Sequence, residues 1–153
     1  MGYTTDFEGE IDITPQLPSD YVAKINEMAS QRNNTYGDGD EGSFDHVLHG
    51  KRGKTPPTEG LRNSAWTAVP GCWCQWVLRQ DIGRTIIEWD GGEKFYDYTP
   101  WLAYLVSLIK RDNPGSKFSG TINWAGEDKN DLGQLRVSAD GTVSSHVGTI
   151  TYG

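Results

Sequence analysis

The sequence predicts an α+β domain in which two helices lie on one face of an antiparallel sheet. Several short stretches alternate apolar and polar residues, which indicates strands with one buried face. Two longer stretches repeat apolar residues every three or four positions, which indicates helices. The segments follow one another as β-α-β-β-α-β and then two more strands. That order is typical of the ferredoxin-like plan, so we expect a ferredoxin-like sheet extended by a C-terminal β-hairpin, in a single domain over residues 1–153.

The first predicted strand, residues 6–13, shows the clearest alternation. Phe7, Ile11 and Ile13 fall on one side together with Gly9. The other side carries only carboxylates, which are Asp6, Glu8, Glu10 and Asp12. We therefore expect this strand to bury one side and to expose an acidic side to water, inside the sheet and next to the fourth strand.

A short helix and then a long irregular segment are expected after the first strand. The helix begins near Ser19, a favourable N-cap residue, with Asp20 in its first turn. Its apolar stripe consists of Val22, Ile25, Met28 and Ala29. Residues 33–65 are polar, rich in glycine and proline, and without periodicity, so we expect a long loop or insertion there.

A β-hairpin and a second helix are expected next. Strands over residues 72–78 and 85–89 flank a turn at residues 81–84. Thr99 is the expected N-cap of the helix, with Pro100 at its first position. Apolar side chains cover a wide arc of this helix, so we expect it to be well buried through Trp101, Leu102, Leu105, Val106, Leu108 and Ile109.

Three strands are expected at the C-terminal end. Residues 117–124 alternate and echo the first strand, because both contain Phe-x-Gly-x-Ile. A strand over residues 133–137 follows. Asp140-Gly141 then indicates a two-residue turn into a last strand within residues 142–152.

Composition and charge exclude several function classes. The 153 residues are 35% hydrophobic and 23% charged, which is not typical of a disordered or fibrous protein. A net charge of −7 argues against a general nucleic-acid binder, which needs a basic surface. Because no stretch resembles a membrane span or a secretory signal, we expect a cytoplasmic protein with reduced thiols at Cys72 and Cys74.

Four motifs resemble those of one family of small proteins. They are GYTTDFEG (residues 2–9), WCQW (73–76), IEWDGGEKFYDY (87–98) and WAGED (124–128). The family comprises uncharacterised bacterial and bacteriophage proteins without an assigned activity. The resemblance implies a phage or mobile-element setting, a host-cell cytoplasm and no particular chemistry, and residues 33–65 take no part in it.

The acidic side of the first strand is the first candidate binding site. Successive carboxylates on one side of a strand lie roughly 6.6 Å apart, close enough to repel one another. Arg79, Lys117 or Arg136 on neighbouring strands could neutralise them. Without such neutralisation the face favours a basic partner; a solvated, locally neutralised face is the alternative. The candidate residues are Asp6, Glu8, Glu10 and Asp12.

An aromatic and turn surface is the second candidate binding site. The chain has six tryptophans, most of which must be core residues in a domain of this size. Trp73 and Trp76 point to opposite faces of their strand, so at least one is expected to be partly exposed and able to anchor a ligand or partner. Asp90 and Glu93 flank two glycines in the following turn, which lacks the pattern of a phosphate-binding loop.

Two sets of residues resemble metal sites but have simpler interpretations. His46, His49, Cys72 and Cys74 offer the ligand types of zinc, but Cys-x-Cys is shorter than a zinc knuckle. The acidic loop at residues 127–133 lacks the ligand order of a calcium loop, and a polar hairpin turn explains it. We therefore expect no metal and no cofactor.

These observations favour a non-enzymatic binding protein that docks onto a host or phage protein. A nucleotide-type small-molecule binder is the alternative, using aromatic residues and the irregular segment. A small hydrolase is a third hypothesis, because carboxylates cluster along residues 88–97 and could act as acid and base: Glu88, Asp90, Glu93 and Asp97. No nucleophile motif accompanies them. Oligomeric state stays open, and exposed sheet edges permit a dimer.

Overall fold

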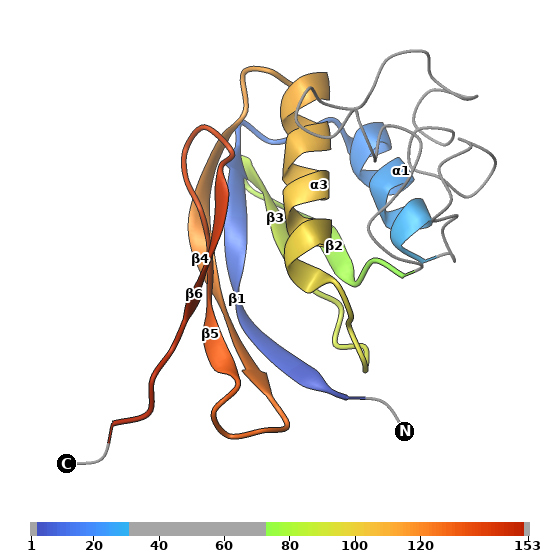
Figure 1. Cartoon of the computed structure of the whole chain (residues 1–153). Coiled ribbons are helices and arrows are strands. Elements are labelled where there is room, and N and C mark those ends of the chain that lie inside the picture. Colours follow the sequence, from blue (N-terminus) through green and yellow to red (C-terminus); the bar gives the residue numbers. More distant parts are fainter. Residues whose placement is uncertain (1–2, 31–72, 152–153) are drawn as a thin grey trace, which may run out of the picture.

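Six strands form one antiparallel sheet in the order β2-β3-β1-β4-β5-β6 (Figure 1). The structure is a computed structural model and describes residues 3–30 and 73–151. The strands are β1 (Thr5–Thr14), β2 (Trp76–Asp81), β3 (Arg84–Trp89), β4 (Lys117–Gly126), β5 (Leu132–Val137) and β6 (Val143–Val147). The helices are α1 (Ser19–Ala29) and α3 (Tyr98–Asp112). The segment expected at residues 33–65 lies outside the described residues.

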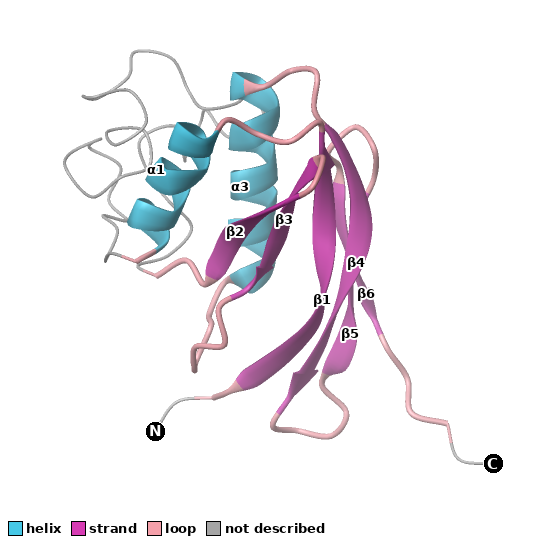
Figure 2. Cartoon of the chain, turned by 180° about the vertical axis from the view of Figure 1, so that it is seen from behind, coloured by secondary structure: helices cyan, strands magenta, loops and turns pink. Residues whose placement is uncertain are grey.

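The predicted α+β class is confirmed. Figures 1 and 2 show both helices on the same side of the sheet, and all strand pairs are antiparallel. The order of the six strands taken together does not match a four-stranded ferredoxin-like sheet, because β5 and β6 continue the sheet beyond β4. Within the described residues, neither helix is long and apolar enough to cross a membrane.

β1 lies inside the sheet, between β3 and β4. It pairs with β4 over its whole length, from Thr5 opposite Gly126 to Thr14 opposite Lys117. The predicted alternation is confirmed, since Phe7, Ile11 and Ile13 are buried while the carboxylates point to the other side. The expected neighbourhood of the first and fourth strands is also confirmed.

Two glycines allow β1 and β4 to approach closely. They occupy equivalent places in the two echoing stretches, and both have positive φ, 116° at Gly9 and 142° at Gly120. A Cβ atom at Gly9 would lie 2.5 Å from the backbone oxygen of Thr121, and one at Gly120 would collide in the same way with the backbone oxygen of Glu10. Glycine is thus required at both places by conformation and by space, and the echo marks a local two-fold arrangement.

The helices begin without side-chain caps. α1 starts at Ser19 as predicted, but its N-cap is Pro18, whose carbonyl accepts the N–H of Val22 (3.1 Å). The prediction that Thr99 caps the second helix is wrong. α3 starts earlier because Asp97 adopts a left-handed φ of 60° and its carbonyl accepts the N–H of Trp101 (2.9 Å). Pro100 therefore lies within the first turn, where no helical hydrogen bond needs its missing N–H.

The core fills the space between the sheet and the helices. The predicted stripe of α1 is buried in full, and so is the wide arc of α3, with Tyr104 added to it. Phe7 is the centre of an aromatic cluster, where its ring makes edge contacts with Trp76, Trp89, Phe95 and Tyr98 at centroid distances of 5.0 to 5.7 Å. This cluster accounts for two of the tryptophans noted in the sequence.

The hairpins differ from expectation in their ends. The predicted turn after Asp81 is confirmed, with Gly83 at φ 74°. However, β2 begins at Trp76, four residues later than residue 72, and includes Asp81. The turn before β6 is longer than two residues, because the N–H of Ser138 donates to the carbonyl of Thr142 (3.0 Å). β6 itself ends at Val147 rather than near residue 152.

Side chains bond the backbone of the edge strand β2 at two places, Leu78 and Asp81. The Asn26 amide in α1 bonds both backbone groups of Leu78, donating to its carbonyl (2.9 Å) and accepting from its N–H (2.8 Å). Gln16 donates to the carbonyl of Asp81 (2.8 Å). The opposite edge strand, β6, pairs only with β5 among the described residues.

Candidate functional site

The candidate site is the side of the sheet that neither helix covers, here called the outer face. Strand alternation and the ladder register place all four acidic residues of β1 on it. The neighbouring strands add mostly polar side chains. The outer face thus includes Asp6, Glu8, Glu10, Asp12, Val77, Arg79, Asp81, Arg84, Ile86, Glu88, Lys117, Ser119, Thr121, Asn123, Ala125, Leu132, Gln134, Arg136, Ser144 and His146.

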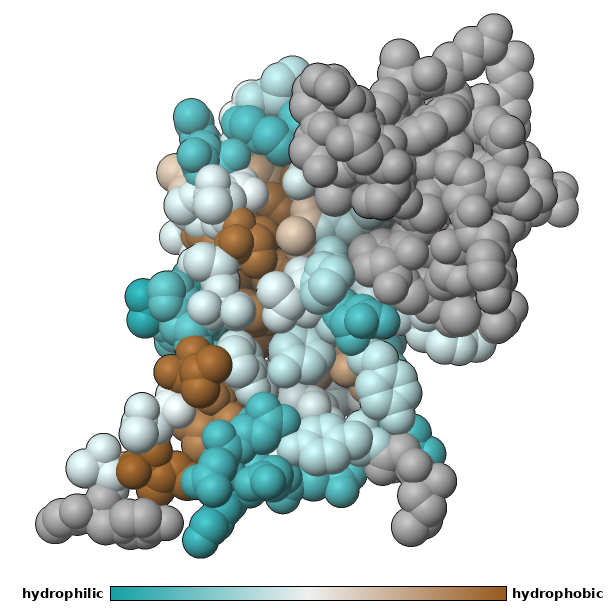
Figure 3. All heavy atoms as spheres, viewed as in Figure 1, coloured by the Kyte–Doolittle hydropathy of each residue, from teal (hydrophilic) through white to brown (hydrophobic). Residues whose placement is uncertain are grey.

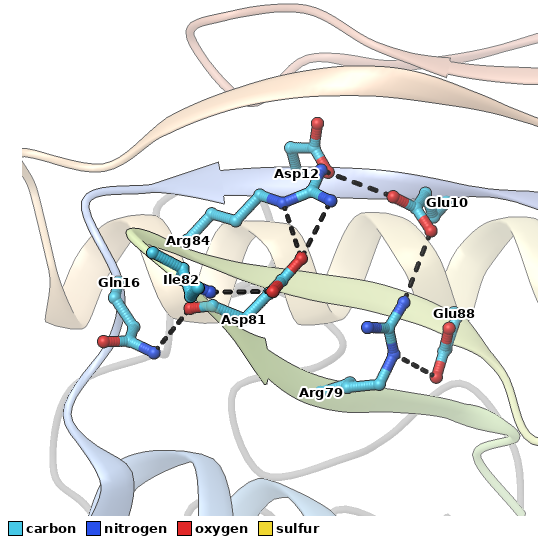
Figure 4. A network of polar contacts seen from close by, with 8 residues as sticks. All are labelled: Glu10, Asp12, Gln16, Arg79, Asp81, Ile82, Arg84 and Glu88. Atoms are coloured by element: carbon cyan, nitrogen blue, oxygen red, sulfur yellow. Dashed lines mark hydrogen bonds and ion pairs between the residues drawn. The ribbon is translucent and has the colours of Figure 1, made fainter.

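Arg84 forms ion pairs with the carboxylates in the C-terminal half of the acidic row (Figure 4). Its guanidinium lies 2.6 Å from Asp12, 3.4 Å from Glu10 and 2.9 Å from Asp81. The hydrogen bond to Asp81 raises the pKa of Arg84. The pKa of Asp81 is lowered by the N–H of Ile82 and then by Arg84, so this carboxylate stays ionised.

Arg79 extends the same network across the face. It donates to Glu88 at 3.0 Å, which raises the pKa of the guanidinium, and it lies 3.5 Å from Glu10. Of the three residues that could neutralise the row, Arg79 therefore reaches one of its carboxylates, Glu10. Arg136 does not take part, because its Nε donates to Gln134 at 2.6 Å.

Beneath this network lies an apolar residue, Ile86. It is fully buried, yet it does not belong to the core between the sheet and the helices. In the ladder it stands opposite Arg79 on one side and Asp12 on the other. Arginine stems cover apolar surface while their charged ends stay in water. The network therefore shields Ile86 as well as balancing charge.

The N-terminal half of the acidic row is open. Asp6 and Glu8 are exposed, and neither forms an ion pair or hydrogen bond within the described residues. Their neighbours on β4 are Ala125 and Asn123, which carry no charge. Two adjacent carboxylates thus face water without a counter-charge, and repulsion between them is relieved only by solvent, salt or a basic partner.

Next to this open half, polar and apolar residues of β4, β5 and the end of β6 surround a shallow, open hollow of about 440 Å³, among them Asn123, Gln134, Trp124, Leu132 and Val147. The Gln134 amide donates to Asn123 (2.9 Å), and the Ser144 hydroxyl lies 2.9 Å from Nε2 of His146. These contacts are local and satisfy each other. The hollow therefore combines apolar and polar lining, and these polar groups bond to one another.

The acidic loop between β4 and β5 serves the structure. Asp131 accepts hydrogen bonds from the Tyr3 hydroxyl (2.7 Å) and the Trp124 indole (3.0 Å), and Glu127 accepts the N–H of Thr4 (2.5 Å). These carboxylates tie the N-terminal residues to the end of the sheet. Across the described residues, no group of three metal-ligating side chains converges.

The second predicted surface is only partly formed. Trp73 is 51% exposed, and Asp90 and Glu93 are exposed beside the following turn. Trp76, in contrast, is fully buried and donates its indole N–H to the carbonyl of Tyr98 (2.9 Å). It belongs to the aromatic cluster and not to a binding surface, because its side chain points to the helices.

The carboxylates of residues 88–97 have separate tasks. Glu88 pairs with Arg79 on the outer face, and Asp90 accepts the N–H of Gly92 (2.7 Å) within its turn. Gln75 holds this turn by donating to the carbonyl of Glu93 (2.8 Å). Glu88 thus offsets charge on the outer face, while Asp90 and Gln75 position the backbone of the turn.

Cys74 is buried beside the aromatic cluster. Its thiol donates to the carbonyl of Trp76 (3.4 Å), and burial raises its pKa to about 12. A thiol of this kind is a poor metal ligand and nucleophile, since both roles need the thiolate. The other residues of the zinc hypothesis, His46, His49 and Cys72, lie outside the described residues.

Comparison with family models, curated proteins and solved structures gives no match for this chain. The function is therefore inferred from the geometry of the outer face. Sequence reasoning missed Arg84, which carries most of the neutralisation. Its position at the end of the predicted turn was the available signal, because the first residue of a returning strand faces its partner strand's last residue.

Proposed function

We propose that this chain is a non-enzymatic binding protein that docks onto a basic surface of another protein through its outer face. The observation that carries the proposal is the contrast within one row of β1. Glu10 and Asp12 are paired with arginines, whereas the exposed Asp6 and Glu8 have no counter-charge among the described residues. An open sheet face with such a charged half suits a lysine- or arginine-rich partner.

We propose that the protein is associated with a phage or mobile element and acts on a host or phage protein in the cytoplasm. A net charge of −7 supports association with basic proteins and opposes association with nucleic-acid backbones. We also infer that β1 to β4 with the two helices form a ferredoxin-like unit. The position of β1 between antiparallel β3 and β4, with both helices on one side, supports this inference.

The test compares two double variants with the same change in charge. Asp6→Asn with Glu8→Gln removes the open carboxylates. The control, Asp20→Asn with Glu27→Gln, removes two exposed carboxylates of α1. Binding to an immobilised lysine-rich peptide is measured at several salt concentrations, and captured host proteins are then identified with the same three proteins. We expect the first variant to associate more slowly and with a weaker salt dependence, and the control to match the wild type.

Equal binding by all three proteins would show that the open half of β1 is only a solvated face. Equal loss in both variants would show that net charge alone attracts the peptide. Circular dichroism and thermal unfolding exclude a folding defect, which we do not expect because substitutions at exposed positions cost within about 0.5 kcal/mol.

A nucleotide-type ligand is a second proposal, carried by the half-exposed ring of Trp73. Such a ring stacks on flat aromatic ligands. Mass spectrometry of small molecules released from the purified, denatured protein distinguishes the two proposals, and Trp73→Ala should abolish any stoichiometric ligand that is found.

A further inference from the structure

We propose that β6 pairs with β6 of a second copy of this chain, antiparallel and about a two-fold axis at Ser145. The proposal is independent of the acidic row, because it concerns the edge of the sheet and not its outer face. The partner is a second copy, the two strands run antiparallel, and Ser145 of one copy lies opposite Ser145 of the other.

The hydrogen-bond pattern of the last hairpin determines which backbone groups of β6 are free. Gly148 donates its N–H to the carbonyl of Leu132 (2.8 Å), and Ser138 donates to Thr142 (3.0 Å). Hydrogen-bonded and non-bonded pairs alternate in an antiparallel ladder. Ser144 and His146 therefore bond to β5, and the N–H and C=O groups of the three remaining residues point away from the sheet: Val143, Ser145 and Val147.

These free groups complement a second copy of themselves. With Ser145 opposite Ser145 of the second copy, Val143 lies opposite Val147, and every outward group meets an outward group. The three residue pairs then form about six backbone hydrogen bonds, two in each pair. The strand reads Val-Ser-Ser-His-Val, so the antiparallel match places valine against valine and serine against serine or histidine.

Side-chain positions agree with this pairing. Val143, Ser145 and Val147 share the helix-facing side of the sheet, since their partners on β5 include the buried Leu135. Val147 is 80% exposed, and Figure 3 shows hydrophobic residues at the surface near the C-terminal tail. In the pair, each Val147 is covered by Val143 of the second copy, which removes apolar surface from water.

The edge also lacks the devices that usually prevent strand addition. Edge strands of monomeric proteins carry charged residues, prolines or bulges. Residues 141–151 contain no lysine, arginine, aspartate, glutamate or proline. No like charges therefore meet across the seam at neutral pH. Within the described structure, the other edge strand, β2, has the outward groups of Leu78 occupied by the Asn26 amide, whereas all three outward residues of β6 are free for a second sheet.

The test uses the full chain and two variants of one residue. Ser145→Pro removes an outward N–H, and because that group does not bond to β5, the monomer should keep its ladder. Ser145→Ala is the matched control, which keeps the N–H. Sedimentation equilibrium over a range of concentrations measures the mass. We expect the wild type and Ser145→Ala to approach about twice the 17.0 kDa of one chain, and Ser145→Pro to stay at the mass of one chain with unchanged thermal unfolding.

A second variant keeps the test decisive if the proline disturbs the hairpin. Val147→Lys leaves every backbone group in place but puts a charge on an exposed side chain that the pair would cover, so it should also stay at the mass of one chain. A wild type at the mass of one chain under all conditions overturns the proposal. So does a dimer that persists in both Ser145→Pro and Val147→Lys, because its interface would then lie elsewhere. Neither readout depends on a basic partner, so failure here is distinct from failure of the proposed function.

Discussion

The two edge strands of the sheet are treated in opposite ways. In β2 the Asn26 amide of α1 bonds both outward backbone groups of Leu78, and Gln16 bonds the carbonyl of Asp81 at the end of the strand. β6 has outward groups at Val143, Ser145 and Val147 that no described residue occupies. An asparagine of α1 thus bonds one edge, whereas no described side chain bonds the other. The difference shows that β6 is left open although the other edge of the same sheet is bonded by side chains.

Hydrogen exchange should give the largest contrast between the edges. In dilute solution, the Leu78 amide should exchange roughly 100-fold or more slowly than the Ser145 amide, because it is freed only when α1 leaves β2. Exchange followed by NMR at single-residue resolution measures both. Similar rates at the two residues would mean that the Asn26 seal opens freely. Slower exchange of Ser145 at high protein concentration would sharpen the contrast, since it is the residue on the proposed two-fold axis.

Removing the seal should cost the most stability of the substitutions considered for β2. Asn26→Leu leaves the N–H and C=O of Leu78 without partners in a partly buried place, so we expect the free energy of unfolding to fall by about 2 kcal/mol. Urea unfolding measures it. Glu27→Gln, on the exposed side of the same helix, is the control and should be neutral within about 0.5 kcal/mol. A neutral Asn26→Leu would show that water replaces the amide without loss.

The pH dependence of the free energy of unfolding tests whether the Cys74 thiol is shielded from water. The unfolded thiol ionises near pH 8.5, whereas the folded thiol has a pKa of about 12. Between these values the unfolded state releases a proton that the folded state keeps, so the free energy of unfolding falls by up to about 1.4 kcal/mol per pH unit. Below about pH 8 this contribution is fully present. Measured by urea unfolding, the free energy of unfolding should therefore fall more steeply between about pH 8 and about pH 10 for the wild type than for Cys74→Ala. Parallel curves would contradict the burial of this thiol.

The outermost part of the seal should matter least. Gln16 is exposed and makes one hydrogen bond, to the carbonyl of Asp81. Gln16→Leu should change the free energy of unfolding by no more than about 0.5 kcal/mol, because water can bond the released carbonyl. A loss comparable to that of Asn26→Leu in the same urea experiment would show that the edge is closed as one cooperative unit.

The parts of the fold that follow from periodicity could be predicted from the sequence. Alternation in β1 identified its buried and acidic sides, and the stripes of α1 and α3 were identified residue by residue. Where local conformation decides, the sequence was less informative. The start of α3 depends on Asp97 in a left-handed conformation, which competes with the more common capping by Thr99.

The candidate site could be predicted only in its carboxylates. Their common side followed from a period of two, but their neutralisation depended on ladder register, which a single sequence does not determine. Register brings Arg84 and Arg79 beside Glu10 and Asp12 and leaves Asp6 beside Ala125. Trp73 and Trp76 were named together because alternation places them on opposite faces, and alternation alone does not tell which of the two faces is buried; it is the face of Trp76.

The inner position of β1 has a consequence for the way this protein is made. β1 leaves the ribosome first, yet its ladder neighbours β3 and β4 are at residues 84–89 and 117–126. The sheet cannot close around its own first strand until most of the chain has been translated, and pairing across such separations slows folding. Until β3 and α3 have been translated, α1 is the described element that can cover the apolar side of β1. Nascent chains that end before β4 should therefore depend on chaperones more than chains that include β4.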